Sequence, residues 1–401
     1  MDDIVVIGAG QAGSSLVVKL RNLGFSGAIT LIGDESARPY QRPPLSKKYL
    51  LGQMDLERLY LRPASFYAEN NITLMTSRTA VSIDRDAKTV GVDGAKIPYG
   101  QLALTTGSTP RTLPAAIGGA LKGVHTVRSL ADVDAMAPAF VKDARILIVG
   151  GGYIGLEAAA VAALSGMKVT LIEMADRILQ RVAAPETSSY FRALHQGHGV
   201  DIREQMGLER LTGEDHVTGA ILSDGTELPC DIGIVGIGVA PNVGLAEDAW
   251  INLDNGIAVD IKGRTSDPFI WAAGDCASLP YKGARIRLES VQNAIDQAEC
   301  VAENMLGADK DYVPIPWFWS DQYDTKLQIA GLNTGYDRIV TRGSGAAVSF
   351  WYYHGETLLA VDAMNDARAY MVGKRLIEMG KSPDPAVIAD AEADLKPLLK
   401  A

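Results

Sequence analysis

Cysteine is scarce in this chain. Its 401 residues include three cysteines, Cys230, Cys276 and Cys300, which lie far apart in the sequence and are odd in number. Such a set does not build a disulfide framework. A chain with so few thiols is typical of a reducing compartment, so we expect a cytoplasmic protein.

Long apolar runs and an excess of positive charge are also lacking. No run approaches the roughly 18 apolar residues of a membrane-spanning helix. An apolar strand follows residues 1–3 directly, which leaves no room for a signal peptide. The net charge of −10 argues against nucleic acid as the main partner. We therefore expect a globular protein that associates with neither membrane nor nucleic acid.

Glycine, in contrast, is abundant, and two stretches share one glycine pattern. Residues 3–13, DIVVIGAGQAG, and residues 145–157, RILIVGGGYIGLE, each run from an apolar strand into G-x-G-x-x-G. In such a loop the first glycine makes a tight turn, the second lets the backbone approach a pyrophosphate, and the third allows close packing of helix on strand. The glycines concerned are Gly8, Gly10 and Gly13, then Gly150, Gly152 and Gly155.

An acidic residue stands behind each loop at the distance expected of a ribose-binding carboxylate. Asp34 follows Gly8 by 26 residues and Glu173 follows Gly150 by 23, close to the roughly 20 residues that are typical. Strand, loop, helix and acid together predict two dinucleotide sites, and the plainer alternative is that one of the loops is only a structural turn. A carboxylate at Glu173 accepts a bond from a ribose 2′-OH and repels a 2′-phosphate, so the second site favours NAD(H) over NADP(H).

The elements around these loops predict a doubly wound architecture. Strands are expected at 4–7, 28–32, 145–149 and 168–172, with helices at 13–23 and 155–166. The proline-rich segment 38–48 is expected to be a loop. From about residue 314 the sequence becomes aromatic and alternates like antiparallel strands that turn at His354-Gly355, and a last helix is expected at about 366–380. The predicted fold class is α/β with two Rossmann-like dinucleotide-binding domains plus a C-terminal α+β domain.

Two loops in this order resemble the FAD-dependent pyridine-nucleotide reductases, in which the first fold binds FAD and the second binds NADH. AAGDC at 272–276 resembles the family's second FAD fingerprint, and LTTGSTPR at 104–111 and GIGVAPN at 236–242 resemble its two domain crossings. Thr105 stands where the family usually has alanine. The resemblance implies a glutathione reductase-like division into an FAD-binding domain of residues 1–108 and 241–313, an NAD-binding domain of residues 109–240, and a C-terminal domain of residues 314–401.

Within this superfamily, several stretches resemble the ferredoxin reductases of bacterial oxygenase systems, of the putidaredoxin reductase type. They include RPPLSKKYL at 42–50, LESVQNA at 288–294 and PWFWSDQY at 316–323. The resemblance places Lys47 and Trp319 beside the flavin and Glu157 on the nicotinamide side. If Lys47 and Glu157 meet, their charges would tune the electrostatics of the reduced ring.

The remaining candidate residues follow from the glycine loops and from the same resemblance. The full FAD set is Gly8, Gly10, Ala12, Gly13, Asp34, Lys47, Ala80, Arg128, Asp275 and Val291. The NAD(H) set is Gly150, Gly152, Ile154, Gly155, Glu157, Glu173, Arg181 and Gly238. Plainer roles stay open: Arg128 and Arg181 as surface charges, Trp319 as a core aromatic, and Glu157 as a complement to the helix dipole.

Disulfide chemistry does not fit the sequence, because the loop Arg42-Pro43-Pro44-Leu45-Ser46 carries no cysteine. His195 and His198 lack further ligands nearby, so no metal site is expected. The resemblance therefore implies an NADH-dependent ferredoxin reductase: an FAD flavoprotein that takes hydride from NADH and passes electrons singly to a [2Fe-2S] ferredoxin supplying a cytochrome P450 or a ring-hydroxylating dioxygenase.

Two alternatives share the architecture: a rubredoxin or monodehydroascorbate-type reductase, and a redox-sensing flavoprotein like apoptosis-inducing factor. Ferredoxins are generally acidic and this chain is acidic as well. Docking therefore needs an apolar contact or a local basic cluster. The candidates for such a cluster are Arg62, Arg285, Arg287 and Lys326.

Overall fold

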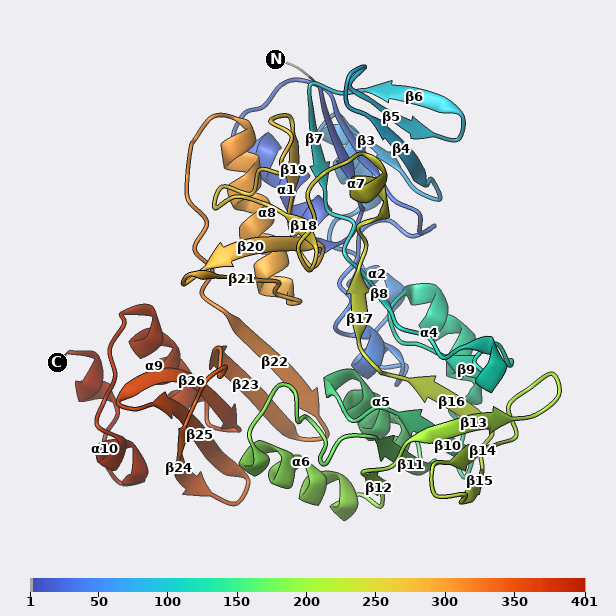
Figure 1. Ribbon diagram of the computed structural model, residues 1–401, viewed down its shortest axis with the longest axis vertical. Helices are drawn as coiled ribbons and strands as arrows, with labels where there is room; N and C mark the ends of the chain where they lie inside the picture. Colours follow the sequence, from blue (N-terminus) through green and yellow to red (C-terminus); the bar gives the residue numbers. More distant parts are fainter. Residues whose placement is uncertain (1–2, 401) are drawn as a thin grey trace. The chain divides into compact units, whose positions relative to one another are not determined.

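The computed structural model describes residues 3–400, which form two compact units (Figure 1). Unit 1 takes in the described parts of Met1–Arg42, Asp55–Thr109 and Val239–Pro314, and unit 2 those of Pro43–Met54, Pro110–Gly238 and Ile315–Ala401. The division into three domains stays a prediction. Its outermost positions, residues 1–2 and 401, lie outside the described residues.

The core of unit 1 is a five-stranded parallel sheet in the order β19-β7-β1-β2-β3. Its strands are β1 (Ile4–Ile7), β2 (Ile29–Ile32), β3 (Ile72–Met75), β7 (Gln101–Leu104) and β19 (Ile270–Ala272). Ile4 pairs with Ile29 on one side and with Gln101 on the other. The chain thus extends the sheet first to one side of β1 and later to the other, which makes the end of β1 a topological switch point where ligands bind.

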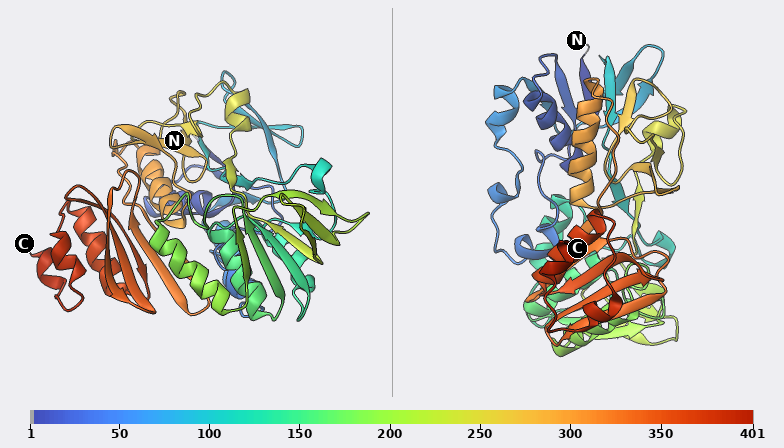
Figure 2. Two further views of the ribbon diagram at one scale, coloured as in Figure 1. Left: turned by 60° about the horizontal axis from the view of Figure 1, so that its bottom comes forward. Right: turned by 90° about the vertical axis from the view of Figure 1, so that its left-hand side faces the viewer.

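Alternate residues of this sheet serve two cores. Ile4 and Val6 belong to the core formed with α1 (Gln11–Asn22) and α8 (Val291–Met305). These two helices pack side by side, as Figure 2 shows. Val5 and Ile7 belong to the other core, which is shared with the antiparallel sheet β4 (Ala80–Asp84), β5 (Thr89–Val92) and β6 (Ala95–Pro98). Burial on both faces is why β1 is continuously apolar.

Shorter elements complete unit 1. They are α2 (Leu56–Leu59), α3 (Ala64–Glu69), α7 (Gly244–Asp248), β18 (Ile257–Ala258), β20 (Ala277–Tyr281) and β21 (Ala284–Ile286). The chain leaves the unit through β8 (Ser108–Pro110) and re-enters it through β17 (Val239–Pro241).

Unit 2 repeats the order of four of these strands, while its edge strand β9 precedes the central strand in the chain and the edge strand β19 of unit 1 comes last. Its parallel sheet runs β12-β11-β10-β16-β9. The strands are β9 (Val124–His125), β10 (Arg145–Val149), β11 (Lys168–Glu173), β12 (Asp201–Glu204) and β16 (Ile232–Val235). The second glycine loop follows β10, which occupies the same central place as β1. The two sequence repeats are therefore also topological repeats over four strands, β3-β2-β1-β7 and β12-β11-β10-β16.

Helix α5 (Tyr153–Leu164) follows the second loop and is apolar on almost every side, because residues 155–162 are all buried. The other helical segments in this part of unit 2 are α4 (Leu130–Met136), α6 (Pro185–Gly197) and the short turns η2 (Ala115–Ile117) and η3 (Ala137–Ala139). A small antiparallel sheet contains β13 (Leu208–Thr212), β14 (Gly219–Leu222) and β15 (Glu227–Pro229).

The C-terminal part of unit 2 is an antiparallel sheet in the order β22-β23-β26-β25-β24. Its strands are β22 (Trp317–Gln322), β23 (Thr325–Gly331), β24 (Arg338–Ser344), β25 (Ala347–His354) and β26 (Thr357–Met364). Helix α9 (Ala367–Glu378) packs on β23 and β26 and is followed by α10 (Pro385–Ala389) and η4 (Lys396–Leu399). The predicted turn at His354-Gly355 and the predicted fold class are both confirmed.

Two local predictions differ from the structure. Both loop helices begin two residues earlier than predicted, at Gln11 and Tyr153, because the second glycine of each loop is the N-cap. The segment 38–48 is not all loop, since Leu45–Tyr49 forms a helical turn, η1. Pro43 and Pro44 precede that turn, where a missing N–H costs nothing. None of the helices within residues 3–400 is long and apolar enough to cross a bilayer.

Candidate functional site

The first glycine loop closes tightly on its own sheet. Gly8 has a φ of +110°, and a Cβ atom there would lie 2.1 Å from the carbonyl oxygen of Thr105. A Cβ atom on Gly13 would lie 2.0 Å from the carbonyl oxygen of Gly8. Thr105 Oγ1 donates to the carbonyls of Ile7 (3.1 Å) and Gly8 (2.9 Å). Thr105, noted from the sequence only as a departure from alanine, therefore helps to fix this turn.

The middle glycine of this loop is different, because a Cβ atom on Gly10 would meet nothing within 4 Å. Gly10 is the N-cap of α1, and no side chain among residues 3–400 caps that end. Its first-turn amides can therefore serve an anion. Helices α4, α8 and α9 have side-chain caps from Ser129, Ser290 and Asp366 instead.

The second loop repeats this geometry. A Cβ atom on Gly150 (φ +109°) would lie 2.4 Å from the Gly236 carbonyl oxygen, and one on Gly155 would lie 2.1 Å from that of Gly150. A Cβ atom on Gly152 would again meet nothing within 4 Å, and the described residues offer no side-chain cap to α5. Each loop thus combines a closed side toward the protein and an open amide end. The residues present fit one dinucleotide phosphate group at each loop.

The predicted FAD residues of unit 1 gather partly around the first loop. A Cβ atom on Gly274, in the AAGDC segment, would lie 3.0 Å from the Cβ of Ala12. The next residue, Asp275, accepts a hydrogen bond from Ser108 Oγ at 3.0 Å. Val291 is the first residue of α8. From the same helix Gln297 accepts the Gly274 N–H at 2.9 Å. The Gln297 Nε2 group is buried without a partner among the described residues, as a donor awaiting a bound group would be.

The other two predicted FAD residues of unit 1 lie at strand ends. Asp34 is exposed after β2, and Ala80 is buried at the start of β4. The neighbouring acid, Glu35, is engaged by the guanidinium of Arg42 and by the hydroxyl of Tyr40. Glu35 is therefore committed to the protein, whereas Asp34 is exposed.

Glu173 lies where the sequence predicted it, at the end of β11 beside the second loop. Its Oε2 atom accepts the Gly151 N–H at 2.7 Å, and its Oε1 atom accepts the Ala175 N–H at 2.8 Å. These bonds fix the carboxylate at the glycine loop and leave lone pairs for a further donor. Arg177, the nearest cation that follows in the sequence, is bound to Ser188 Oγ and to the carbonyl of Ala183.

Three more predicted NAD(H) residues lie on the same unit. Ile154 is partly exposed in the first turn of α5. Arg181 is exposed, and a Cβ atom on Gly238 (φ +100°) would come within 3.8 Å of its guanidinium. Arg128, predicted at FAD, precedes the N-cap of α4, and its backbone N–H donates to Asp132 Oδ2 at 3.2 Å. The structure thus brings Arg181 and Gly238 together.

Lys47 and Glu157 also meet, although 110 residues separate them in the sequence. Lys47 Nζ lies 2.6 Å from Glu157 Oε2, and that carboxylate is only 3% exposed. Ser46 Oγ donates to the same oxygen at 2.6 Å, and Ser320 Oγ donates to Oε1 at 2.7 Å. A buried carboxylate persists only with such compensation. Lys47 itself interrupts η1 with the non-helical angles φ −140° and ψ −112°.

Trp319 is half-buried on β22, where its ring packs against Trp317 with the centroids 5.5 Å apart. The adjacent Phe318 packs on Tyr153, the first residue of α5, at 5.0 Å. Ser320 was missed from the sequence. The signal was present in PWFWSDQY, whose two-residue alternation places Ser320 and Gln322 on the face of β22 opposite to Trp317 and Trp319.

Two of the four residues of the predicted basic docking cluster are bound within the protein. Arg287 has a side chain only 11% exposed and is bound to Glu289 and to the carbonyls of Asn255 and Asp275. Arg285 donates to backbone carbonyls and pairs with Asp254. Arg62 and Lys326 are exposed. Arg285, although exposed, and Arg287 are therefore engaged within unit 1, and the docking cluster stays a prediction that depends chiefly on Arg62 and Lys326.

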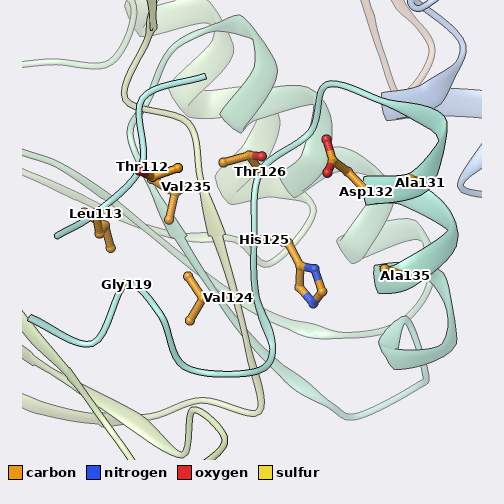
Figure 3. A pocket seen from close by; sticks show the side chains of 10 residues that line it. All are labelled: Thr112, Leu113, Gly119, Val124, His125, Thr126, Ala131, Asp132, Ala135 and Val235. Carbon is orange, nitrogen blue, oxygen red and sulfur yellow. The ribbon is translucent and has the colours of Figure 1, made fainter. Parts of the chain in front are cut away.

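A separate hollow of about 260 Å³ lies between α4 and β9, as Figure 3 shows. His125 and Asp132 line it, together with Thr112, Thr126 and apolar side chains. Burial lowers the pKa of His125, while the nearby Asp132 carboxylate acts in the opposite direction. No residue predicted for a cofactor lines this hollow, so it is distinct from the glycine loops.

Known proteins match the chain over almost its whole length. The pyridine nucleotide-disulphide oxidoreductase family matches residues 2–298, and the reductase C-terminal family matches residues 317–399. Rhodocoxin reductase of Rhodococcus erythropolis is 43% identical over 401 residues, which cover 98% of this chain and 93% of that protein. Putidaredoxin reductase CamA of Pseudomonas putida is 40% identical over 410 residues, which cover 100% and 97%.

Solved structures agree with these relatives. The crystal structure of the covalent putidaredoxin reductase–putidaredoxin complex matches with a TM-score of 0.96 at 39% identity, covering 100% of this chain and 98% of that chain. The ferredoxin reductase for the CYP199A2 system from Rhodopseudomonas palustris matches with a TM-score of 0.95 at 41% identity, covering 99% of each chain. The resemblance noted from the sequence is confirmed. The chain belongs to the pyridine nucleotide-disulphide oxidoreductase family.

Proposed function

We propose that this protein is an NADH-dependent ferredoxin reductase with FAD as its resident cofactor. Its electrons would pass singly to a [2Fe-2S] ferredoxin that supplies a cytochrome P450 or a ring-hydroxylating dioxygenase. Full-length relatives support this reading, among them the reductases named for rhodocoxin and putidaredoxin. A third relative is the ferredoxin–NAD(+) reductase component of the anthranilate 1,2-dioxygenase system of Burkholderia cepacia, at 38% identity.

The observation that carries the proposal is that the Lys47–Glu157 pair, and no redox-active thiol, follows the segment Pro43 to Ser46. The segment before it, Pro43 to Ser46, holds no thiol, and Ser46 donates its hydroxyl to Glu157. The three cysteines of the chain are buried elsewhere and form no disulfide. Burial raises the pKa of each thiol, which keeps all three in the unreactive protonated form. Electrons therefore leave to an external acceptor rather than to a disulfide of this chain.

The residues of the two loops would divide the work of binding. In unit 1 the α1 amides at Gly10 would hold the FAD phosphates, and Asp275 would accept from its sugar hydroxyls. In unit 2 the α5 amides at Gly152 would hold the NADH phosphates, and Glu173 would accept from the adenosine ribose. Bound FAD supplies the exchange between two-electron and one-electron transfer. Glu157 holds the Lys47 ammonium beside α5, the helix whose N-terminus would carry the nucleotide.

The structure supports a preference for NADH over NADPH. Glu173 is a carboxylate fixed beside the second glycine loop, where an acid of this kind would accept from a ribose 2′-OH and repel a 2′-phosphate. Arg177, which could have balanced that phosphate, is committed to Ser188 and a backbone carbonyl. A cytoplasmic location also belongs to the proposal, since three unpaired cysteines suit a reducing compartment.

Rubredoxin is the second candidate acceptor, because a rubredoxin-NAD(+) reductase of Pseudomonas putida is 38% identical over 368 residues. The test is to purify the protein with FAD and to measure NADH-driven reduction of a [2Fe-2S] ferredoxin and of a rubredoxin under anaerobic conditions. We expect about one FAD per chain and faster reduction of the ferredoxin. Protein that takes up no FAD would refute the proposal, and faster reduction of rubredoxin would favour the second candidate.

The same experiment tests nucleotide choice. Glu173→Ala should narrow the preference for NADH over NADPH by about tenfold or more, the effect of losing one hydrogen bond to a charged group. Saturable flavin reduction that is equally fast with both nucleotides in the wild type would contradict the role of Glu173.

A further inference from the structure

A chain of buried polar side chains continues from Glu157 to the turn between β22 and β23. Ser320 Oγ, which donates to Glu157, accepts from Gln322 Nε2 at 3.1 Å. Gln322 Oε1 lies 2.7 Å from His195 Nε2, and His195 Nδ1 lies 3.1 Å from the hydroxyl of Tyr323. Ser320, Gln322 and His195 are each at most 1% exposed. Four hydrogen bonds thus link Tyr323 to Glu157 through α6 and β22.

In each of these four hydrogen bonds, the donor lies on the Tyr323 side and the acceptor on the Glu157 side. The Ser320 hydroxyl must donate, because the ionised partner of Lys47 can only accept. The Gln322 amide then donates with its nitrogen and accepts with its oxygen, so His195 carries its proton on Nε2. Burial lowers the pKa of His195 to about 4, which leaves the ring neutral and lets Nδ1 accept from Tyr323. Aligned donors polarise one another and strengthen the last bond, the one to Glu157.

The far end of the chain is held in a strained conformation. Tyr323 has a φ of +55°, which is uncommon for a bulky residue. The ring of the exposed His198 stacks on it with the centroids 3.7 Å apart. A strained residue persists only where its surroundings determine it. The hydrogen bond to His195 and the stacking on His198 hold Tyr323 in this conformation.

We propose that His195, Gln322 and Ser320 are positioning residues, which orient the Glu157 carboxylate and through it the Lys47 ammonium for hydride transfer from NADH. This inference rests on the proposed function. This row of hydrogen-bonded side chains orients the Glu157 carboxylate and does not conduct protons. To pass a proton, the Gln322 amide would have to change its tautomer. Apolar residues of similar volume would hold α6 against β22 equally well, but they would leave the Glu157 Oε1 atom without its donor.

The test compares single variants by stopped-flow reduction of the FAD-loaded protein with NADH. Ser320→Ala and Gln322→Met should each lower the limiting rate by about tenfold, the effect of one hydrogen bond to a charged group. The apparent dissociation constant for NADH should change by less than about twofold, because neither side chain belongs to the nucleotide loops. Ser349→Ala is the matched control: it removes another fully buried hydroxyl from the same antiparallel sheet, on β25, and should leave the rate unchanged.

Glu157→Gln separates positioning from general support of the fold. In a Glu157→Gln background, Ser320→Ala and Gln322→Met should slow flavin reduction no further. A further slowing as large as that in the wild-type background would overturn the proposal, because the two side chains would then act without Glu157.

A readout without NADH completes the test. Carbon-13 carboxyl NMR of glutamate-labelled protein gives the Glu157 resonance, identified by its loss in Glu157→Gln. That resonance should move in Ser320→Ala and in Gln322→Met and stay in place in Ser349→Ala. An unmoved resonance in the first two variants refutes positioning. The proposed function fails separately, if the wild type binds FAD but reduces neither carrier.

Discussion

A single buried carboxylate organises the residue-scale chemistry of unit 2. Glu157 receives an ammonium and two hydroxyl donors on its two oxygens. Removing one partner would leave a buried charge incompletely compensated, which costs more than the pair itself contributes. The donors come from η1 and β22, so the ionised carboxylate ties two distant parts of the sequence to α5. The pair therefore specifies the local arrangement more than it adds to stability.

Stability should depend on pH through His195. Burial lowers its pKa from 6.5 to about 4. Between those values the unfolded chain binds a proton that the native protein does not. The free energy of unfolding is therefore unaffected by this group above about pH 6.5 and falls as the pH is lowered through that window. From pH 7 to pH 4 the wild type should lose about 3 kcal/mol more than His195→Gln, as measured by urea unfolding.

The difference between the two proteins isolates the effect of His195 from that of Asp362, another buried titratable group of unit 2. Burial raises the pKa of Asp362 to about 6, so that group acts with the opposite sign over the same range. Asp362 is present in both proteins and cancels in the comparison. Unfolding curves of wild type and His195→Gln that shift in parallel from pH 7 to pH 4 would show that the imidazole is accessible to protons.

At the scale of elements, the two glycine loops each use the same two kinds of glycine. Gly13 and Gly155 face the carbonyl of the first glycine, at distances that admit no Cβ atom. Gly10 and Gly152 face open space and cap a helix. One kind of glycine is thus required by the fold, and the other leaves room for a ligand.

A matched pair of substitutions separates these roles in the second loop. Gly155→Ala should destabilise the protein by about 3 kcal/mol, because its Cβ atom would overlap the Gly150 carbonyl. Gly152→Ala has ordinary φ and free space, so it should cost less than about 1 kcal/mol and yet weaken NADH binding by about tenfold or more. Thermal unfolding without nucleotide and titration with NADH measure the two effects. Gly152→Ala protein that binds NADH like the wild type would remove this loop from the site.

The loops were predictable from the sequence because each is a local feature. Strand, glycines, helix and acid lie within one continuous stretch, and the structure places Gly8, Gly150 and Glu173 as the pattern requires. The network around Glu157 was predicted only in part. Ser320 and His195 lie on elements far apart in the sequence, and no local period says that their side chains converge. His195 has no further ligands nearby in the sequence, so no metal site was expected there. Nothing local in the sequence indicates that its ring is a buried hydrogen-bond donor.

At the scale of the whole molecule, the repeated order of the inner strands explains how one chain comes to hold two glycine loops of the dinucleotide-binding kind. Each sheet places its glycine loop at the switch point beside the central strand, β1 or β10. The C-terminal sheet follows a different, antiparallel plan, and it contributes Ser320 and Gln322 to the polar chain. Part of the machinery proposed for the second nucleotide thus comes from outside the dinucleotide folds.

Charge at this scale governs how an acidic partner approaches. The chain carries a net charge of −10, and Arg285 and Arg287 are committed to carbonyls and carboxylates of unit 1. Repulsion should therefore outweigh attraction at long range, and salt should weaken it, since the Debye length falls to about 10 Å at 0.1 M. Raising NaCl from about 0.02 to 0.5 M should increase the rate of ferredoxin reduction by about two- to threefold under limiting ferredoxin.

Bleaching of the ferredoxin's own absorbance gives that rate, and a neutral quinone serves as a control acceptor, because it carries no charge for the protein to repel. A steep fall with salt for the ferredoxin alone would instead indicate a basic docking surface, and Lys326→Gln and Arg62→Gln should then each flatten that fall.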